Sequence, residues 1–211
     1  MVKIIAISDT HGMHDQLSIP DGDILVHSGD LSNHGRLEEV QSFNAFLGTQ
    51  PHKHKVVVAG NHDYCFEEAP EEAQGLITNA IYLQDEAIEV MGLNFYGSPW
   101  TPWFFDWAFN LHRGAEIKEK WDLIPQGLDM LVTHGPPRGI GDRMMDGEEI
   151  GCDDLRAAIE RAKPKFHICG HVHEGYGVRQ EFGVTFVNAS IANYRYLITN
   201  PATVIEYNVE K

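Results

Sequence analysis

Acidic, amide and imidazole side chains recur in this sequence directly after short apolar runs. Such side chains follow five separate runs, at Asp9 and His11, at Asp30, at Asn61, at His134, and at His171 and His173. In open α/β sheets, ligands bind outside the carboxyl ends of the strands, so we expect these groups to meet at one rim. Their oxygen and nitrogen atoms are of the kinds that bind divalent metal ions.

The number of converging donors indicates more than one ion. Seven oxygen and nitrogen donors exceed a single tetrahedral site but suit two ions that share a bridging carboxylate and a water. Each residue alone has a simpler reading: Asp9 could cap a helix, Asn61 could hold a left-handed turn, and a single histidine is usually a core or surface group. Three of the clusters directly follow Gly29, Gly60 and Gly170, and the ordered combination favours a metal centre.

The chemistry of these donors also narrows the identity of the metal. Magnesium and calcium prefer shells made only of oxygen, whereas mixed shells rich in imidazole favour transition metals. We therefore expect two divalent ions as cofactors, with Mn²⁺ favoured and Fe, Zn, Co or Ni as alternatives.

Hydrophobic periodicity predicts the elements that position these side chains. Short β-branched or apolar runs predict strands, and apolar residues at helical spacing predict helices. Strands are expected over 3–8, 23–28, 55–59, 129–134 and 165–171, and helices over 36–47, 115–124 and 152–163. The segments 87–100, 175–190 and 202–210 predict antiparallel strands, with a turn at Gly92 in the first, and the aromatic segment 98–110 predicts a loop.

Strand–helix–strand units followed by hairpins indicate an α/β fold. We expect a four-layer sandwich, in which two mixed β-sheets pack face to face and the helices lie outside. The length of 211 residues suits one sizeable core, and no stretch has the composition of a linker, so a single domain over residues 1–211 is expected.

Charge and cysteine content limit partners and compartment. The net charge of −15 disfavours a long nucleic acid, although bound metal ions can supply local positive charge for a small phosphate ester. The three cysteines show no metal-knuckle spacing, and neither a signal peptide nor a long apolar run occurs in the sequence. We expect a cytoplasmic protein without a membrane partner, and the sequence leaves the oligomeric state open.

The quoted clusters together resemble the motifs of the calcineurin-like metallophosphoesterase superfamily. The matching segments are "DTH" at 9–11, "GD" at 29–30, "GNHD" at 60–63, "THG" at 133–135 and "GHVH" at 170–173. Other segments, among them "HSGDLSNHG", "VTHGPP" and "VNAS", are similar to the metallophosphoesterase-domain-containing branch, and that likeness covers nearly the whole chain.

The resemblance implies a role for each residue of the pattern. Asp9, His11, Asp30 and His173 would hold one metal ion. Asp30, as the bridge, would hold the other together with Asn61, His134 and His171. His62 would face the substrate phosphate.

The resemblance also raises a question about proton transfer. His62 is the expected general acid for the leaving group, with simple orientation of Asn61 as the alternative. Many members of the superfamily carry an acid three residues after the "GD" aspartate, where this sequence has Asn33. An amide orients an imidazole ring without stabilising its positive charge, so Asp63 is expected to assist His62.

Other polar residues and an aromatic segment are weaker features of the sequence. Asn33, Arg143 and Asn188 are predicted to contact the substrate, with a solvated loop charge as the alternative for Arg143. The aromatic residues between Trp100 and Trp107 favour loop packing over stacking on a nucleobase.

The predicted function is that of a metal-dependent phosphodiesterase. It would hydrolyse small diesters, cyclic nucleotides included, by in-line attack of a hydroxide that bridges the two ions. A phosphomonoesterase or protein phosphatase with the same metal centre is the alternative, and a non-catalytic scaffold is the alternative from another class. A nuclease for long substrates is disfavoured by the absence of a basic tract.

Overall fold

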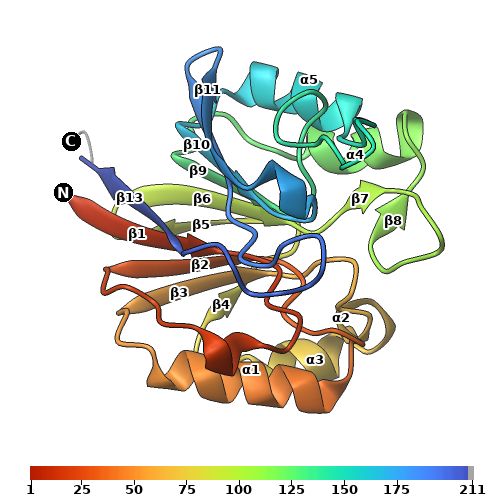
Figure 1. The fold of residues 1–211 in the computed structure, drawn as a ribbon. Coiled ribbons are helices and arrows are strands. Elements are labelled where there is room, and N and C mark those ends of the chain that lie inside the picture. Colours follow the sequence, from red (N-terminus) through yellow and green to blue (C-terminus); the bar gives the residue numbers. More distant parts are fainter. Residues whose placement is uncertain (209–211) are drawn as a thin grey trace.

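Two mixed β-sheets pack face to face in the computed structural model, which describes residues 1–208 (Figure 1). The first sheet has the spatial order β13 (Thr203–Tyr207), β1 (Val2–Ile7), β2 (Ile24–Ser28), β3 (His54–Val58) and β4 (Ile81–Tyr82). The second has the order β11 (Gly177–Glu181), β12 (Val184–Asn188), β10 (Phe166–Cys169), β9 (Met130–Thr133), β6 (Leu93–Ser98) and β5 (Glu86–Val90). Residues 209 and 210 of the predicted final strand lie outside the described residues.

Each sheet has a parallel centre and antiparallel pairing at its edges. In the first sheet β1 to β4 run parallel, with Ile4 opposite Ile24 and Val26 opposite Val56, and β13 runs antiparallel to β1. In the second, β6, β9, β10 and β12 run parallel, whereas β5 and β11 are antiparallel to their neighbours. The carboxyl ends of the parallel strands therefore gather along one edge of each sheet, which is the arrangement that the polar strand-end clusters require.

Three apolar layers hold the sheets and helices together. Residues from both sheets, such as Ile4, Val58, Phe95 and Val132, form the layer between the sheets. The helices α1 (Leu37–Thr49), α2 (Cys65–Glu68) and α3 (Pro70–Leu76) cover the first sheet, and α4 (Ala115–Asp122) and α5 (Asp153–Ala162) cover the second (Figure 1). The predicted four-layer sandwich is confirmed.

The structure differs from the sequence prediction mainly between residues 65 and 111. The short helices α2 and α3 and the two-residue strand β4 were not predicted, because none is long enough to show a clear period. The predicted loop 98–110 contains a small parallel pair, β7 (Thr101–Pro102) and β8 (Asn110–Leu111). Among residues 1–208, no helix is long and apolar enough to cross a membrane.

A buried neutral histidine in β10 makes the stability of the fold sensitive to acid. His167 is fully buried, and its Nε2 lies 2.8 Å from the Thr133 hydroxyl. Burial lowers the pKa of His167 to about 3, whereas an unfolded chain has the ordinary value of about 6.5. Below pH 6.5 the unfolded state therefore binds a proton on His167 that the folded state does not bind. As the pH falls from 6 to 4, this difference should reduce the free energy of unfolding by about 1.4 kcal/mol for each pH unit.

Urea unfolding at pH 7.5, 6 and 5, with a chelator present throughout, measures this effect. A His167→Gln variant should be less stable at neutral pH than the parent chain. The slope of its free energy of unfolding against pH should be smaller than the parent slope by the contribution of about one proton. The exposed His34→Gln variant is the control and should keep the parent slope. Equal slopes for His167→Gln and the parent would contradict the expected burial effect.

Candidate metal centre

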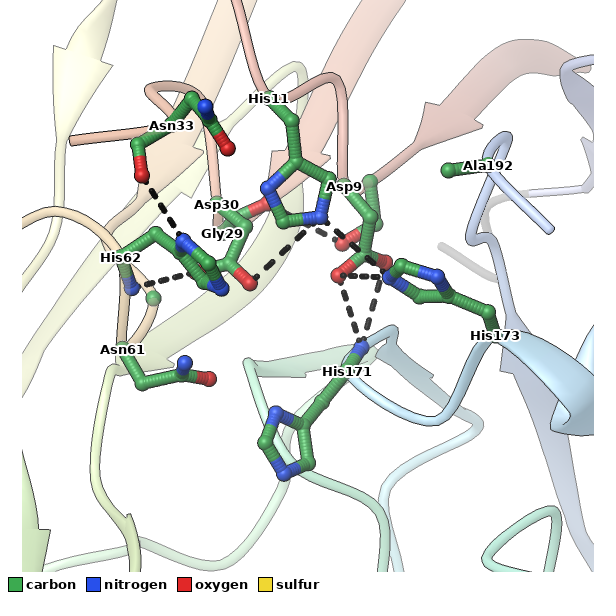
Figure 2. Close-up of polar contacts among 12 residues, drawn as sticks. Asp9, His11, Gly29, Asp30, Asn33, Asn61, His62, His171, His173 and Ala192 are labelled. Carbon is green, nitrogen blue, oxygen red and sulfur yellow. Dashed lines mark hydrogen bonds and ion pairs between the residues drawn. The ribbon is translucent and has the colours of Figure 1, made fainter. Parts of the chain in front are cut away.

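The polar side chains that follow the parallel strands of both sheets meet in one place (Figure 2). Asp9, Asp30 and Asn61 follow β1, β2 and β3 of the first sheet, whereas His134 and His171 follow β9 and β10 of the second. Of these five side chains only His171 is partly exposed. The face-to-face packing thus joins two strand-end clusters into a single group.

Asp30 lies at the centre of the group. Its Oδ1 accepts a hydrogen bond of 2.8 Å from the backbone N–H of His62, which fixes the carboxylate plane. Its Oδ2 lies 3.3 Å from His134 Nε2 and 3.9 Å from His11 Nε2. One oxygen of Asp30 therefore faces donors on two sides, as a bridging ligand must.

Two sets of donors flank Asp30. On one side the carboxylate of Asp9 lies 3.6 Å from His173 Nε2, which itself lies 3.3 Å from His11 Nε2. On the other side His134 Nε2 lies 2.9 Å from Asn61 Oδ1. Ligating atoms of Asp9, His11 and His173 lie within 4.8 Å of one another, as do those of Asp30, His134 and His171. A third set joins His11, Asp30 and His62. The residues of the two shells that the resemblance implies thus lie close together, and their assignment to two ions stays a prediction.

Backbone carbonyls orient two of the imidazoles toward the centre. His134 Nδ1 donates to the carbonyl of Ser28 at 3.0 Å, and His173 Nδ1 donates to the carbonyl of Asn193 at 2.9 Å. With the proton held on Nδ1, the Nε2 lone pair of each neutral ring points into the site. Such outer hydrogen bonds are typical of histidines that bind metal ions.

The electrostatics of the group favour a bound cation. Burial would raise the pKa of Asp30, but the charge and hydrogen bond of His134 hold it well below its usual value. Burial would likewise lower the pKa of His134, yet the carboxylates of Asp30 and Asp9 raise it to about 9. The two buried carboxylates thus attract positive charge into the space between the metal-ligating atoms. A divalent ion there would compensate their negative charge, as a proton on His134 does.

Unusual backbone geometry accompanies this convergence. Asp9, His11, Asp30 and His171 all have positive φ angles, of 57°, 44°, 56° and 65°. Such angles are uncommon for residues other than glycine and cost free energy, and they concentrate at functional sites. Gly60 supplies the clearance that this packing needs, because a Cβ there would overlap Asp30 Oδ1 and approach His134 Cε1 to 2.7 Å.

His62 lies at the mouth of the group. Its Nδ1 donates to the backbone carbonyl of Asn33 at 2.9 Å (Figure 2). Its ring packs edge-on against His11 and tilted against Trp107. Asn33 therefore orients His62 through its backbone, while its side-chain amide contacts His34 instead. The Nε2 of His62 is left free for a substrate or a proton.

Four residues predicted to take part in catalysis or substrate binding do not line the cavity at this centre, and one of them is Asn33. Asp63 is fully buried and accepts hydrogen bonds from the backbone of Leu31, Ser32 and Gly60, so it braces two ligand-bearing loops and does not contact His62. Arg143 is exposed and pairs with Glu149. Asn188 is buried and holds the "GHVH" loop by donating to the carbonyl of Val172 at 2.8 Å.

The structure brings in residues that no sequence motif indicated. Tyr196 packs against His11 and His173, with ring centroids 4.8 and 5.2 Å apart. The side chain of Asn193 accepts from the backbone N–H groups of Arg195 and Leu197, so it shapes the loop that carries Tyr196. Short polar and aromatic loops without periodicity carry no signal in a single sequence.

Some residues of the aromatic segment near residue 100 pack in the fold, and others lie beside the site. Trp100 donates to the Asp85 carboxylate and packs against Phe109, as a structural residue does. The Trp107 ring lies 4.3 Å from that of His62 in a tilted arrangement, and the Phe104 ring lies 5.4 Å from that of His171. Part of this segment therefore forms the wall of the site.

A cavity of about 260 Å³ opens over the converging donors. Asp30, Asn61, His62, His171 and His173 lie at its base or side, and its remaining wall includes Tyr196 and Glu174. None of the described residues that line it is a lysine or an arginine. Positive charge in this cavity can therefore come only from protonated histidines or from bound ions.

Sequence comparison identifies relatives over nearly the whole chain. The family model "Calcineurin-like phosphoesterase" matches residues 2–175. The chain is 41% identical to human metallophosphoesterase domain-containing protein 1 over 229 aligned positions, which cover 97% of this chain and 70% of the relative. It is 42% identical to a UPF0046 protein of Caenorhabditis elegans, over 92% of this chain and 76% of that one.

Solved structures share the arrangement of sheets and helices. One aligns with a TM-score of 0.69 at 19% identity and covers 92% of this chain and 91% of its own. Another, described as a novel archaeal phosphodiesterase, aligns with a TM-score of 0.51 at 16% identity, over 97% of this chain and 93% of its own. At such identities these likenesses concern the fold alone. The extent of the family-model match and the identity to the curated relatives show that the chain belongs to the calcineurin-like phosphoesterase family.

Proposed function

We propose that the protein is a dinuclear, metal-dependent phosphodiesterase that acts on small diesters. The family is one of metal-dependent phosphoesterases, and the donors around Asp30 form two sets that share one carboxylate. When bound, two divalent cations would supply Lewis acidity and a nucleophile at neutral pH. Mn²⁺ fits the mixed imidazole and oxygen donors, with Fe, Zn, Co or Ni as alternatives.

The charge of the cavity wall is the observation that favours a diester over a monoester. A phosphodiester carries one negative charge near neutral pH, whereas a phosphomonoester carries close to two. The wall has no lysine or arginine among its described residues, and Glu174 adds a carboxylate. The second charge of a monoester would therefore find no permanently cationic partner beyond the ions, and a monoanionic diester is the better match.

The residues of this chain take distinct parts in the proposed reaction. The paired imidazoles, acids and amide hold the cations, and the carbonyls of Ser28 and Asn193 keep His134 and His173 in the binding tautomer. His62 faces the phosphoryl group and gives a proton to the leaving oxygen. The Nδ1 proton of His62 is held by the Asn33 carbonyl, so a proton for the leaving oxygen must come from Nε2. A ring with protons on both nitrogens is positively charged, so only the charged form of His62 can act as the general acid.

Rates on two aryl esters test the diester assignment. With Mn²⁺ present, bis-p-nitrophenyl phosphate should be hydrolysed at least about tenfold faster than p-nitrophenyl phosphate, the ratio that corresponds to about 1.4 kcal/mol. A Glu174→Gln variant should narrow this ratio, because it removes a negative charge from the cavity wall. Faster turnover of the monoester would favour the phosphomonoesterase alternative, and no hydrolysis with any transition metal would favour a scaffold.

Replacement of Asp30 tests the shared metal centre. Asp30→Asn keeps the shape of the side chain but removes the charge between the two donor sets, so bound Mn²⁺ should fall below two ions per chain. Loss of outer-shell partners already lowers metal affinity or activity 10- to 100-fold, so kcat/KM should fall by more than about 100-fold. Metal analysis after dialysis and diester kinetics provide the two measurements.

A matched variant controls for the loss of a carboxylate elsewhere. Asp122 is half exposed and pairs with Lys118 at the end of α4, so Asp122→Asn should retain both metal content and activity. Full metal content and full activity in Asp30→Asn would refute the bridging role of Asp30.

Substrates with different leaving groups test whether His62 acts as the general acid. Glutamine cannot deliver a proton, so His62→Gln should slow hydrolysis of cyclic AMP, which has an alkoxide leaving group, by about 10²- to 10⁴-fold. Release of p-nitrophenolate needs little protonation and should slow by roughly tenfold or less. His54→Gln, at the opposite end of β3 from Asn61, serves as the control. Equal losses on both substrates would assign His62 to phosphate binding alone.

A further inference from the structure

A second cavity adjoins the candidate metal centre. Its volume is about 520 Å³, and it shares Phe104, Met144, Ile150 and His171 with the cavity over the metal-binding group. The shared residues include one of the predicted ligands, His171. The second cavity therefore adjoins the metal centre along these residues, within reach of a molecule whose phosphoryl group lies on that centre.

The wall of the second cavity is mainly apolar and aromatic. Its apolar residues include Trp103, Phe104, Phe105, Pro136, Met144 and Ile150. Phe105 is 84% exposed, Trp103 is 47% exposed and Met144 is 37% exposed. Concave groups of large apolar side chains left open to water are typical of ligand sites. An apolar cavity of about 150 Å³ already holds a benzene molecule in another protein, so one or two rings fit here.

The charged groups of the second cavity exclude a further phosphate. Its one arginine, Arg113, donates to the carbonyls of Ile150 and Gly151 at 2.6 and 2.7 Å, and lies 3.6 Å from the Asp153 carboxylate. Asp146 and Glu148 place two carboxylates on the same wall. An occupant with a second anionic group would meet these carboxylates, whereas an uncharged ring would only bury apolar surface.

We propose that the second cavity is a subsite for an uncharged aromatic or extended apolar ester group of the diester substrate. This inference rests on the proposed phosphodiesterase function and names the class of substrate that the site selects. The phosphoryl group would bind at the metal centre, and one ester group would lie against Phe104, Phe105 and Met144. Substrates whose ester group carries a further negative charge would be disfavoured.

Binding of simple phosphonates to the Mn²⁺-loaded protein tests this subsite without catalysis. Each phosphonate is used as its monomethyl ester, which carries one negative charge on phosphorus as a diester does, and is named below by its parent phosphonate. Methylphosphonate and phenylphosphonate then share the metal-binding group and differ in the apolar substituent. Titration calorimetry should show that phenylphosphonate binds at least about tenfold more tightly, since burial of a ring yields about 25 cal/mol per Å² of apolar surface. Carboxymethylphosphonate, with a second anionic group, should bind no better than methylphosphonate.

Variants of the cavity wall test whether the phenyl ring binds in the second cavity. Phe105→Ala and Trp103→Ala should each weaken phenylphosphonate binding about three- to tenfold and leave methylphosphonate binding unchanged, because both residues line the second cavity and not the cavity over the metal centre. Phe182→Ala is the matched control, an exposed phenylalanine that lines neither cavity. It should bind both phosphonates as the parent does.

The possible failures differ from one another. Equal affinities for methylphosphonate and phenylphosphonate, or cavity variants that behave as Phe182→Ala does, would overturn the subsite and leave the phosphodiesterase proposal standing. Failure of every phosphonate to bind the Mn²⁺-loaded protein would overturn phosphoryl binding at the metal centre, and the subsite with it.

Discussion

The position of the Asp30 carboxylate, buried between imidazoles that come from both sheets, is the constraint on which the site depends. One of its oxygens is held by the His62 backbone, and the other lies near both His11 Nε2 and His134 Nε2. A buried carboxylate is tolerated only when it is hydrogen-bonded or paired with positive charge. The loop after β2, the clearance at Gly60 and the packing of the two sheets all serve to bring this anion and its partners together.

The two-sheet architecture explains how one centre can hold two sets of donors. In a single open sheet, the carboxyl ends of the strands form one row along one edge. Here two such rows face each other, because β1, β2 and β3 lie in one sheet and β9 and β10 lie in the other. The apolar layer between the sheets sets their separation, so the positions of Asp30 and His134 depend on the packing of residues such as Val58 and Val132. A core residue in this layer therefore has an indirect effect on metal geometry.

Most of this framework could be predicted from the sequence, because strand-end clusters and hydrophobic periods are local signals. The strands around Asp9, Asp30, Asn61, His134 and His171 and the helices α1, α4 and α5 follow from such patterns. The surroundings of Asp63 and Asn188 could not be predicted, since a buried acid or amide that braces loops has the same sequence appearance as one that contacts substrate. Tyr196 reaches the site only through the loop shaped by Asn193, and no pattern of residue types encodes that path.

The strain at the centre links metal binding to the stability of the loops. Asp9, His11, Asp30 and His171 hold positive φ angles while their side chains bring two anions and several imidazole lone pairs close together. Each such angle costs of order 1 to 3 kcal/mol, and the mutual repulsion of buried like groups adds to that cost. The hydrogen bonds from His62 and His171 backbone N–H groups to Asp30 and Asp9 offset part of it. Cations offset the remainder, because metal ions that bind only the folded donors contribute their binding free energy to folding. The arrangement that would position ions is thus the same arrangement that bound ions would stabilise, and the apolar sheet packing must hold the loops close enough to this geometry before any ion binds.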